Sequence, residues 1–366
     1  MTRGLHACDA CLRRTDLIAA IGGVIDVQWR TRRARSQVLG LPDDALLGLA
    51  PAVETRRRYE RFDPVAARRR IADACLAAVC RCSDDYPGRL RELLDPPAVL
   101  HIAGDPTVLR DEDAVAVVGA RRASPYGLEV ARGLGRGLSA AGVPVVSGMA
   151  LGVDAAAHTG ALSAPGATVT VLAGGADVPY PASKRRLYSE LLVRGAVVSE
   201  MPPGFGAFRW CFPARNRLIA ALARITVVVE AAERSGSLIT ADFAADLGRP
   251  VAAVPGQVTS SLAAGGNDLL QAGAALVTGS ADVLDLLFAE GGGAGRPRPP
   301  AAAPAEPLEP HLRALLDAVE QGGGSLARLA VTPEAARAAL QDLTELELRG
   351  LIRRGFGGRY VRAANE

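Results

Sequence analysis

Glycine and serine gather at four turns of the sequence where the backbone could hold a phosphate. The stretches GARRASPYG (119–127) and SGMALGVDAAAH (147–158) each follow an apolar run. Backbone N–H groups at the start of a helix favour anions, and nearby arginines can complete a phosphate clamp. Strand-to-helix turns that bind no ligand would have a similar sequence. The GxGxxG pattern of hydride-transfer enzymes is missing at the first turn, which argues against that class of enzyme. The candidate residues in these turns are Gly119, Arg121, Arg122, Ser147, Gly148, Gly152, Gly174, Ser235, Gly236 and Ser237.

Arginines alternate with aromatic residues in the stretch FRWCFPARNRLIAALA, residues 208–223. Bases of single-stranded nucleic acid stack on aromatic rings while guanidinium groups hold the phosphates. The pattern therefore favours single-strand binding, although it would also serve to anchor a loop. A second basic run follows the YP pair at 180–181 and would otherwise be the solvated start of a helix. The candidates in these two stretches are Lys184, Arg185, Arg209, Phe212, Arg215, Asn216 and Arg217, with Trp210 as a further stacking residue.

Carboxylates and histidines offer a weaker case for catalysis. Asp154 and His158 lie four residues apart on one face of an expected helix and could form an acid/base pair. Glu230 and Glu233 flank the serine-glycine turn and could act as hydrolase carboxylates. Structural roles also explain the same residues. Asp154 would be a helix-capping acid, His158 a hydrogen-bonded core histidine, and the two glutamates would pair with arginine. No GxSxG or HExxH motif is present, so we expect no enzyme, no catalytic residue and no organic cofactor.

Six cysteines are spaced irregularly, which argues against a disulfide scaffold. Cys8 and Cys11 form a CxxC pair, and Cys80 with Cys82 could add two thiolates to make a zinc site. The CxC spacing is unusual for zinc, and reduced cysteines are often simply buried.

Composition excludes several classes of protein. The 49% of hydrophobic residues is ample for a core, and no apolar run reaches the ~18 residues that a membrane span needs. No secretory signal is visible, so we expect a cytoplasmic protein without a membrane partner. The net charge is +3, and Lys184 is the only lysine among 42 basic residues. This small positive net charge is compatible with a nucleic-acid partner but does not require one.

Apolar runs alternate with helical patterns between residues 115 and 290, which predicts a parallel sheet covered by helices. We expect a doubly wound, extended Rossmann-like α/β fold at 83–290 and a helical domain at 1–82. The stretch 291–310, rich in glycine, proline and alanine, reads as a flexible linker. Three helical patterns and a basic hairpin at 311–366 predict a winged helix. The expected strands span 115–118, 143–147, 168–173, 196–200, 225–231, 250–255 and 274–277.

Several long motifs, in order, resemble the DNA-processing protein A family, also called DprA or Smf. They include VAVVGARRASPYG at 115–127, VVSGMALGVDAAAHTGAL at 145–162, FPARNRLIAALA at 212–223 and VVVEAAERSGSLITA at 227–241. The resemblance covers about residues 84–287 and, more weakly, the C-terminal module. It implies a core that binds single-stranded DNA, forms a homodimer, protects incoming DNA and loads the RecA recombinase in natural transformation, without catalysis.

Carried over residue by residue, the resemblance implies DNA contacts at positions already singled out above. These are Arg121, Lys184, Arg185, Arg209, Phe212, Arg215, Asn216 and Arg217. The chain departs from the family's pattern after the second strand, where Ala150, Leu151 and Gly152 replace a motif that carries an arginine. Lys184 stands where the family often has asparagine, so the contact set can differ here.

Two other functions stay open on the residues alone. One is a nucleotide-binding or nucleotide-hydrolysing Rossmann-like enzyme that uses Glu230 and the turn at 235–237. The other is a duplex-binding regulator in which the winged helix reads DNA through Arg353, Arg354 and Arg359.

Overall fold

A computed structural model describes residues 6–31, 37–289, 309–319, 333–349, 351–354 and 360–362. The chain divides into two compact units, residues 1–295 and 296–366. The linker predicted at 291–310 falls almost wholly outside the described residues. Among the described residues, no helix is both long enough and apolar enough to cross a membrane.

The first unit is built on a nine-stranded sheet in the order β1-β2-β6-β5-β4-β3-β7-β8-β9. From β6 to β9 all neighbouring strands are parallel, whereas β2 pairs antiparallel with both β1 and β6. This mixed but mostly parallel sheet confirms the predicted α/β class, and all seven expected strands are present. The strands are β1 Ala77–Cys80, β2 Val99–Gly104, β3 Val115–Val118, β4 Val145–Ser147, β5 Thr168–Val171, β6 Gly195–Ser199, β7 Ile225–Val228, β8 Val251–Ala253 and β9 Ala275–Leu276.

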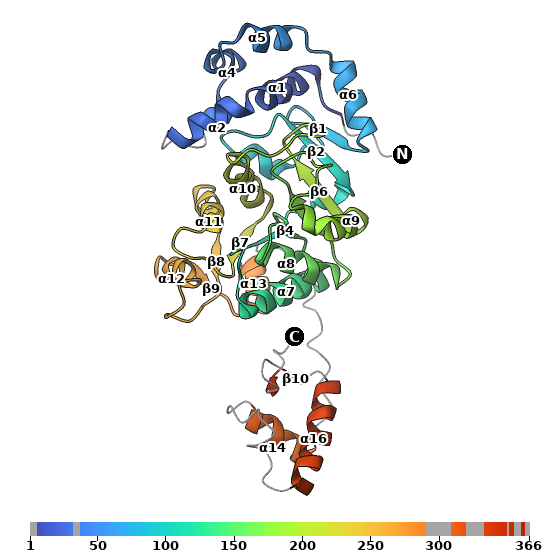
Figure 1. Ribbon diagram of the computed structural model, residues 1–366, viewed down its shortest axis with the longest axis vertical. Coiled ribbons are helices and arrows are strands. Elements are labelled where there is room, and N and C mark those ends of the chain that lie inside the picture. The colour runs from blue at the N-terminus through green and yellow to red at the C-terminus, as the bar shows by residue number, and fades with distance from the viewer. Residues whose placement is uncertain are drawn as a thin grey trace. The chain divides into compact units, whose positions relative to one another are not determined.

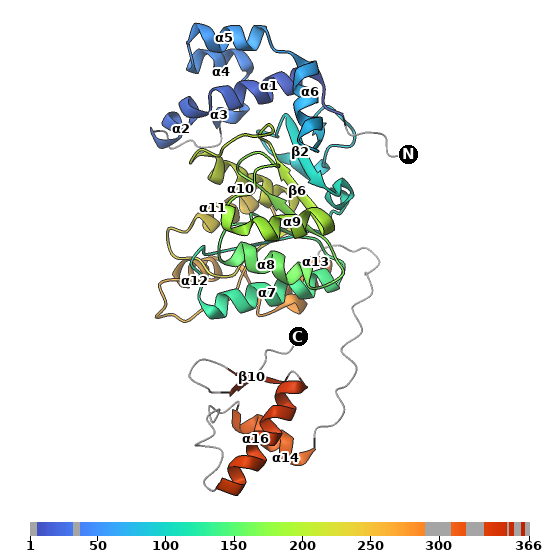
Figure 2. The same ribbon diagram turned by 45° about the vertical axis from the view of Figure 1, so that its right-hand side comes forward.

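Helices cover both faces of the sheet because its strands are apolar on both sides. In β3, Val115 and Val117 pack with α7, α8 and α13. Ala116 and Val118 point to the opposite face, toward α10 and α11. Figures 1 and 2 show α7 and α8 lying side by side. The helices of this part are α7 Pro125–Ala140, α8 Val153–Leu162, α9 Arg185–Arg194, α10 Cys211–Leu222, α11 Gly236–Asp246, α12 Ala264–Gln271 and α13 Ser280–Ala289, with short turns η1 Gly88–Glu92, η2 Pro106–Arg110 and η3 Ala182–Lys184.

The part of the chain described before β1 forms six helices, which gather beside β1 and β2, in blue in Figure 1. They share two apolar clusters with the core, one around Leu12 and Val99 and one around Ile25 and Trp210. The boundary predicted at residue 82 separates β1 from β2, which pair with each other. The N-terminal helices and the α/β core therefore form one unit. These helices are α1 Asp9–Ala20, α2 Gly22–Thr31, α3 Gln37–Gly40, α4 Asp43–Leu49, α5 Val53–Glu60 and α6 Pro64–Asp73.

The second unit contains two described helices, α14 Pro310–Ala318 and α16 Pro333–Leu348. Strands β10 Ile352–Arg354 and β11 Tyr360–Arg362 pair antiparallel, at the position of the expected hairpin. Leu316, Leu346 and Tyr360 are buried in its apolar cluster. The helix expected between α14 and α16 lies outside the described residues, so the winged helix stays a prediction.

A buried histidine joins α8 to the sheet. Thr168 donates its hydroxyl proton to the carbonyl of Val145, so Nδ1 of His158 must donate to Thr168 Oγ1 at 2.7 Å. Nε2 of His158 then accepts from Thr170 Oγ1 at 2.9 Å. Complete burial, aided by the charge of Arg215, lowers the pKa of His158 to about 3. The side chain is therefore neutral and structural, and it forms no acid/base pair with Asp154.

We expect this histidine to make stability depend on pH. Its pKa in the folded state lies below the ~6.5 of an unfolded chain, so its contribution is complete above pH 6.5 and is lost as pH falls toward 3. Between pH 6 and 4 the free energy of unfolding should fall about 1.4 kcal/mol per pH unit more steeply in the wild type than in His158→Gln. Urea titrations at several pH values measure both slopes. Equal slopes would show that His158 is not held neutral in the folded state.

Candidate nucleic-acid interface

A pocket of about 480 Å³ opens where β3 and β7 end. The chain leaves β3 toward β4 on one side, whereas β7 lies on the other side of β3. In doubly wound sheets, ligands bind at such a reversal of strand order, outside the carboxyl ends of the strands. The pocket is lined by residues 118–121, Ala150, Asp154, 212–213, 215–216, Ile219, Ala232, 234–237, 239 and Thr240.

Close packing of two loops forms one wall of the pocket. Gly152 has a φ of +81°, and a Cβ atom there would clash with the carbonyl of Ala120. Val153 N–H donates to the same carbonyl at 3.2 Å, which holds the loop after β3 against the start of α8. Arg121 follows directly in the chain and is exposed. Its guanidinium carbon lies 5.3 Å from the centre of the Phe212 ring.

A buried arginine lies at the bottom of the pocket. Arg215 is only 5% exposed, and its Nη1 donates to the carbonyl of Val171 at 2.7 Å. Gly148 leaves room for this guanidinium, since a Cβ atom there would overlap it. Among the described residues, Nε of Arg215 has no hydrogen-bond partner.

Arg215 stays positively charged at neutral pH despite its burial. Burial lowers the pKa of its guanidinium to about 10, the charge of Asp154 opposes that change, and Arg121 adds to it. Burial also raises the pKa of the Asp154 carboxyl, which accepts from Ala150 N–H at 3.3 Å. A cation with an unpartnered N–H group beneath an open pocket attracts anions.

The amino end of α11 forms another wall. Ser235 caps this helix through a bond from Ser237 N–H at 3.4 Å, and the two hydroxyls lie 2.7 Å apart. Asn216 holds the same turn by donating to the carbonyl of Gly236 at 3.0 Å. The N–H groups of a helix start favour a phosphate, and the exposed Arg234 precedes this one.

Aromatic rings extend the pocket toward the loop that follows β5. Phe212 is half-buried, and its ring centre lies 5.3 Å from that of Tyr180, which is 49% exposed. The same loop runs on to the half-exposed Lys184 and the exposed Arg185. Gly174 lies at its start, close to the carbonyl of Phe205, and does not line the pocket. Two neighbouring rings therefore lie beside Arg121, and the loop that carries one of them continues to two further cations.

Residues 77–288 match the family model described as DNA recombination-mediator protein A. The chain belongs to this family. The relationship confirms the DprA/Smf resemblance of the sequence motifs.

Curated relatives and solved structures agree with this family. A putative DNA processing protein DprA from Mycobacterium tuberculosis is 52% identical over 190 residues, which are 52% of this chain and 49% of the relative. The match thus spans about half the length of that relative. Protein Smf from Synechocystis is 33% identical over 310 residues, 76% of this chain and 78% of the relative.

Two structures of DNA processing protein A superimpose on this family member. The Streptococcus pneumoniae structure is 33% identical, with a TM-score of 0.61, over 75% of this chain and 95% of the other. The Helicobacter pylori structure, described as showing a single-stranded DNA binding mode, is 30% identical, with a TM-score of 0.53. That match covers 58% of this chain and 96% of the other.

Most of the candidate residues of this family member lie in or beside the pocket. Gly119, Arg121, Phe212, Arg215, Asn216, Ser235, Gly236 and Ser237 line it. Gly148 and Gly152 shape it from behind, as described above. Arg122 and Arg209 are exposed, on the loop after β3 and on the loop before α10.

Three candidates are buried in places where DNA cannot reach them. Arg217 is 2% exposed and bonds Asp95 Oδ1 at 3.0 Å and Glu200 Oε2 at 2.7 Å. Trp210 is 1% exposed, and its indole N–H donates to the carbonyl of Gly22. Ser147 is fully buried and donates to the carbonyl of Val117. The interpretation of these three as contact residues is therefore wrong, because each serves the packing of the core.

The carboxylates of the enzyme alternative also have structural partners. Glu230 is buried and accepts from the backbone N–H of Ser124 at 2.8 Å and from its hydroxyl. Ser124 in turn caps α7. Glu230 thus fixes the start of α7 and lies behind the pocket wall, and it pairs with Ser124 instead of the arginine expected from the sequence. Glu233 is exposed and does not line the pocket.

Two residues with the right chemistry were absent from the sequence-based site. Tyr180 stands beside Phe212, and Arg234 stands at the start of α11. The signal for Arg234 is its place directly before a serine-glycine helix start. Tyr180 has no such local signal, because only the fold brings the loop after β5 next to α10.

The buried position of Arg217 gives a stability prediction. Arg217→Met leaves Asp95 and Glu200 buried without their cation, which typically costs about 3 to 5 kcal/mol of unfolding free energy. Arg224→Met is the matched control, because the pair of Arg224 with Asp113 is about a quarter exposed and should cost about 1 kcal/mol or less. Urea unfolding measures both variants. Equal losses in the two would contradict a buried structural role for Arg217.

Proposed function

We propose that the pocket binds the backbone and bases of single-stranded DNA. The observation that supports this most is the meeting of a buried cation, Arg215, with an exposed Arg121 and an aromatic pair at the reversal of strand order. Phosphate and bases both find partners in this one place.

The arrangement indicates how a strand would lie. One phosphate would approach the first N–H groups of α11 together with Arg121 and Arg234, while Arg215 attracts it from below. The next base would stack on Phe212 or Tyr180, with Arg121 shifting from the ring to the phosphate. Lys184 and Arg185 would then hold the backbone beyond the rings.

Single strands fit this site better than duplexes. Stacking on Phe212 requires a base that is unstacked and unpaired, and exposing such a base in a duplex costs free energy. The Helicobacter pylori family member is described as having a single-stranded DNA binding mode. That description supports the same ligand here.

The family supports a wider role, which we propose on that basis. The chain would protect incoming single strands and load the RecA recombinase onto them, acting in the cytoplasm as a homodimer. The description of the family as a recombination mediator supports this role. The proposal includes no catalytic step.

Removal of the Arg121 charge should weaken binding. Arg121→Ala is expected to lower the affinity for oligothymidine about five- to tenfold and to reduce the dependence of log K on log salt by about 0.7, the value for one phosphate contact on a single strand. Fluorescence anisotropy across a salt series measures both quantities.

Arg132→Ala is the matched control for Arg121→Ala. Arg132 is an exposed arginine on α7 that does not line the pocket, so its removal changes the net charge equally. It should leave affinity nearly unchanged. If the two variants lose the same affinity, the effect is one of net charge and the pocket is not the site.

Phe212→Leu separates stacking from charge. Stacking on one aromatic ring contributes about 1 to 3 kcal/mol per base, so we expect affinity to fall about fivefold or more. The salt dependence should not change, because no phosphate contact is removed. The same anisotropy titrations test this. A changed slope with unchanged affinity would argue against stacking at Phe212.

A further inference from the structure

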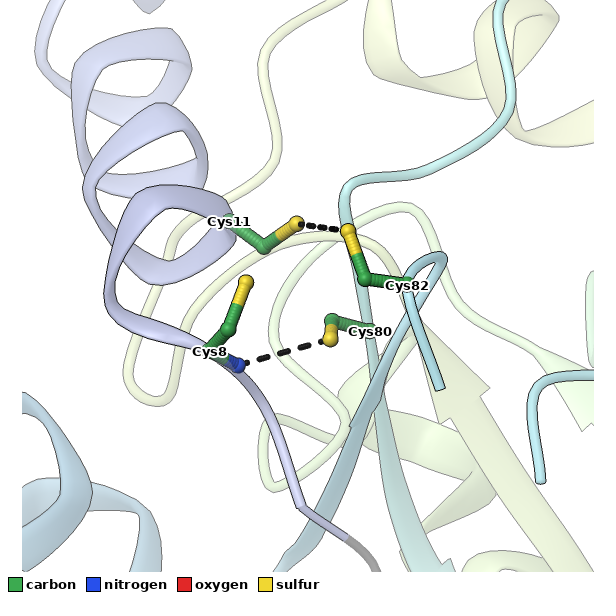
Figure 3. A group of neighbouring side chains, drawn as sticks. All are labelled: Cys8, Cys11, Cys80 and Cys82. Atoms are coloured by element: carbon green, nitrogen blue, oxygen red, sulfur yellow. Dashed lines mark hydrogen bonds between the residues drawn. The ribbon is translucent and has the colours of Figure 1, made fainter. Parts of the chain in front are cut away.

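Four cysteine side chains converge from two parts of the chain that are far apart in sequence. Cys8 is the N-cap of α1 and Cys11 lies in its first turn, whereas Cys80 ends β1 and Cys82 lies in the turn that follows. All four sulfur atoms lie within 4.8 Å of one another (Figure 3). None of these residues lines the proposed DNA pocket.

We propose that Cys8, Cys11, Cys80 and Cys82 bind one structural zinc ion. A tetrahedral ion with Zn–S bonds of ~2.3 Å places its sulfur ligands about 3.8 Å apart. The sulfurs of Cys11 and Cys82 are 3.7 Å apart, and no other two sulfur atoms of the cluster are more than 4.8 Å apart. The side chains already stand where such an ion would hold them.

Hydrogen bonds around the cluster suit thiolate ligands. Cys8 N–H donates to the sulfur of Cys80 at 3.4 Å, and the backbone N–H of Cys11 donates to the sulfur of Cys8. The cluster also lies at the amino end of α1, where the helix dipole favours negative charge. Arg68 donates to the carbonyl of Ala7 at 3.1 Å and pairs with Asp9 in the same turn, so the Asp9 carboxylate adds no uncompensated negative charge beside the cluster. The N–H groups and the helix dipole offset the negative charge of four thiolates on a divalent ion.

Other sulfur chemistries fit the geometry less well. A disulfide needs two sulfurs at about 2.05 Å, and all six cysteines are free. An iron–sulfur cluster places iron and sulfide between its ligands, which requires a wider separation of the thiolates. If the four thiols were buried without a metal, nothing would require their sulfur atoms to converge from two segments of the chain. Four sulfur ligands in a tetrahedron are typical of zinc.

The ligand set also indicates what the ion does. Catalytic zinc keeps one position open for water, whereas a site with four protein ligands is closed and structural. Cys11 and Cys80 are buried in the apolar cluster that joins α1 to β1 and β2. The ion would therefore fasten the N-terminal helices to the antiparallel edge of the sheet, where apolar packing and hydrogen bonds between Cys80 and residues 6 and 8 already join them. This inference does not depend on DNA binding.

Metal analysis of the full-length protein tests the site directly. Protein purified under reducing conditions with zinc present should carry about one zinc per chain by plasma mass spectrometry. Replacement of that zinc by Co²⁺ should give the visible absorption of a tetrahedral tetrathiolate site. Less than about 0.2 zinc per chain, or iron together with acid-labile sulfide, would overturn the proposal.

Two serine variants provide the matched comparison. Cys82→Ser removes a ligand that is exposed, so it should disturb packing little while zinc content falls at least fivefold. Cys75→Ser alters another exposed cysteine outside the cluster and should keep about one zinc per chain. A chelator should lower the melting temperature of the wild type and of Cys75→Ser but not that of Cys82→Ser. Equal zinc content in the two variants would contradict the assignment, and the cobalt spectrum of the wild type decides the matter if Cys82→Ser fails to fold.

Discussion

The position of β3 between β4 and β7 is the constraint on which the rest of the site depends. Because the chain crosses to opposite sides of β3, the loops that follow these strands diverge and leave a pocket between them. Gly152 lets the loops after β3 and β4 touch, and Gly148 admits the Arg215 guanidinium beneath them. The strand order therefore creates the space for the proposed anion site, and the side chains supply its positive charge.

The two arginines of α10 are both buried, but in different surroundings that give them different functions. Arg215 and Arg217 are two residues apart and therefore point to nearly opposite sides of the helix. Arg215 lines the pocket, and its buried Nε has no hydrogen-bond partner among the described residues, whereas Arg217 is held by Asp95 and Glu200 in the core. A buried cation between two carboxylates fixes α10 against the strands. That fixed helix is what places Phe212 beside Tyr180 and Arg121.

Much of this architecture could be predicted from the sequence, for reasons that also explain the failures. Apolar runs such as VAVV mark strands buried on both faces, and glycine turns mark the ends of those strands. Strand β1 escaped prediction because the alanine-rich run of α6 continues into it, and the left-handed residue between them is Cys75 instead of the usual glycine. Local patterns also do not show which side of a helix is buried, so Arg217 and Trp210 were misjudged while Tyr180 was missed. The cysteine cluster could be suspected from spacing, but only the packing of α1 against β1 brings its halves together.

Photocrosslinking of a thiothymidine-substituted oligonucleotide to the full-length chain, with the modified peptides identified by mass spectrometry, tests the central claim most directly. The account predicts crosslinks in the segments that contain Tyr180 and Phe212, and competition by unlabelled single strands more strongly than by duplex. Crosslinks confined to residues 309–366 would contradict it and would favour a duplex-binding regulator that reads DNA with its C-terminal unit.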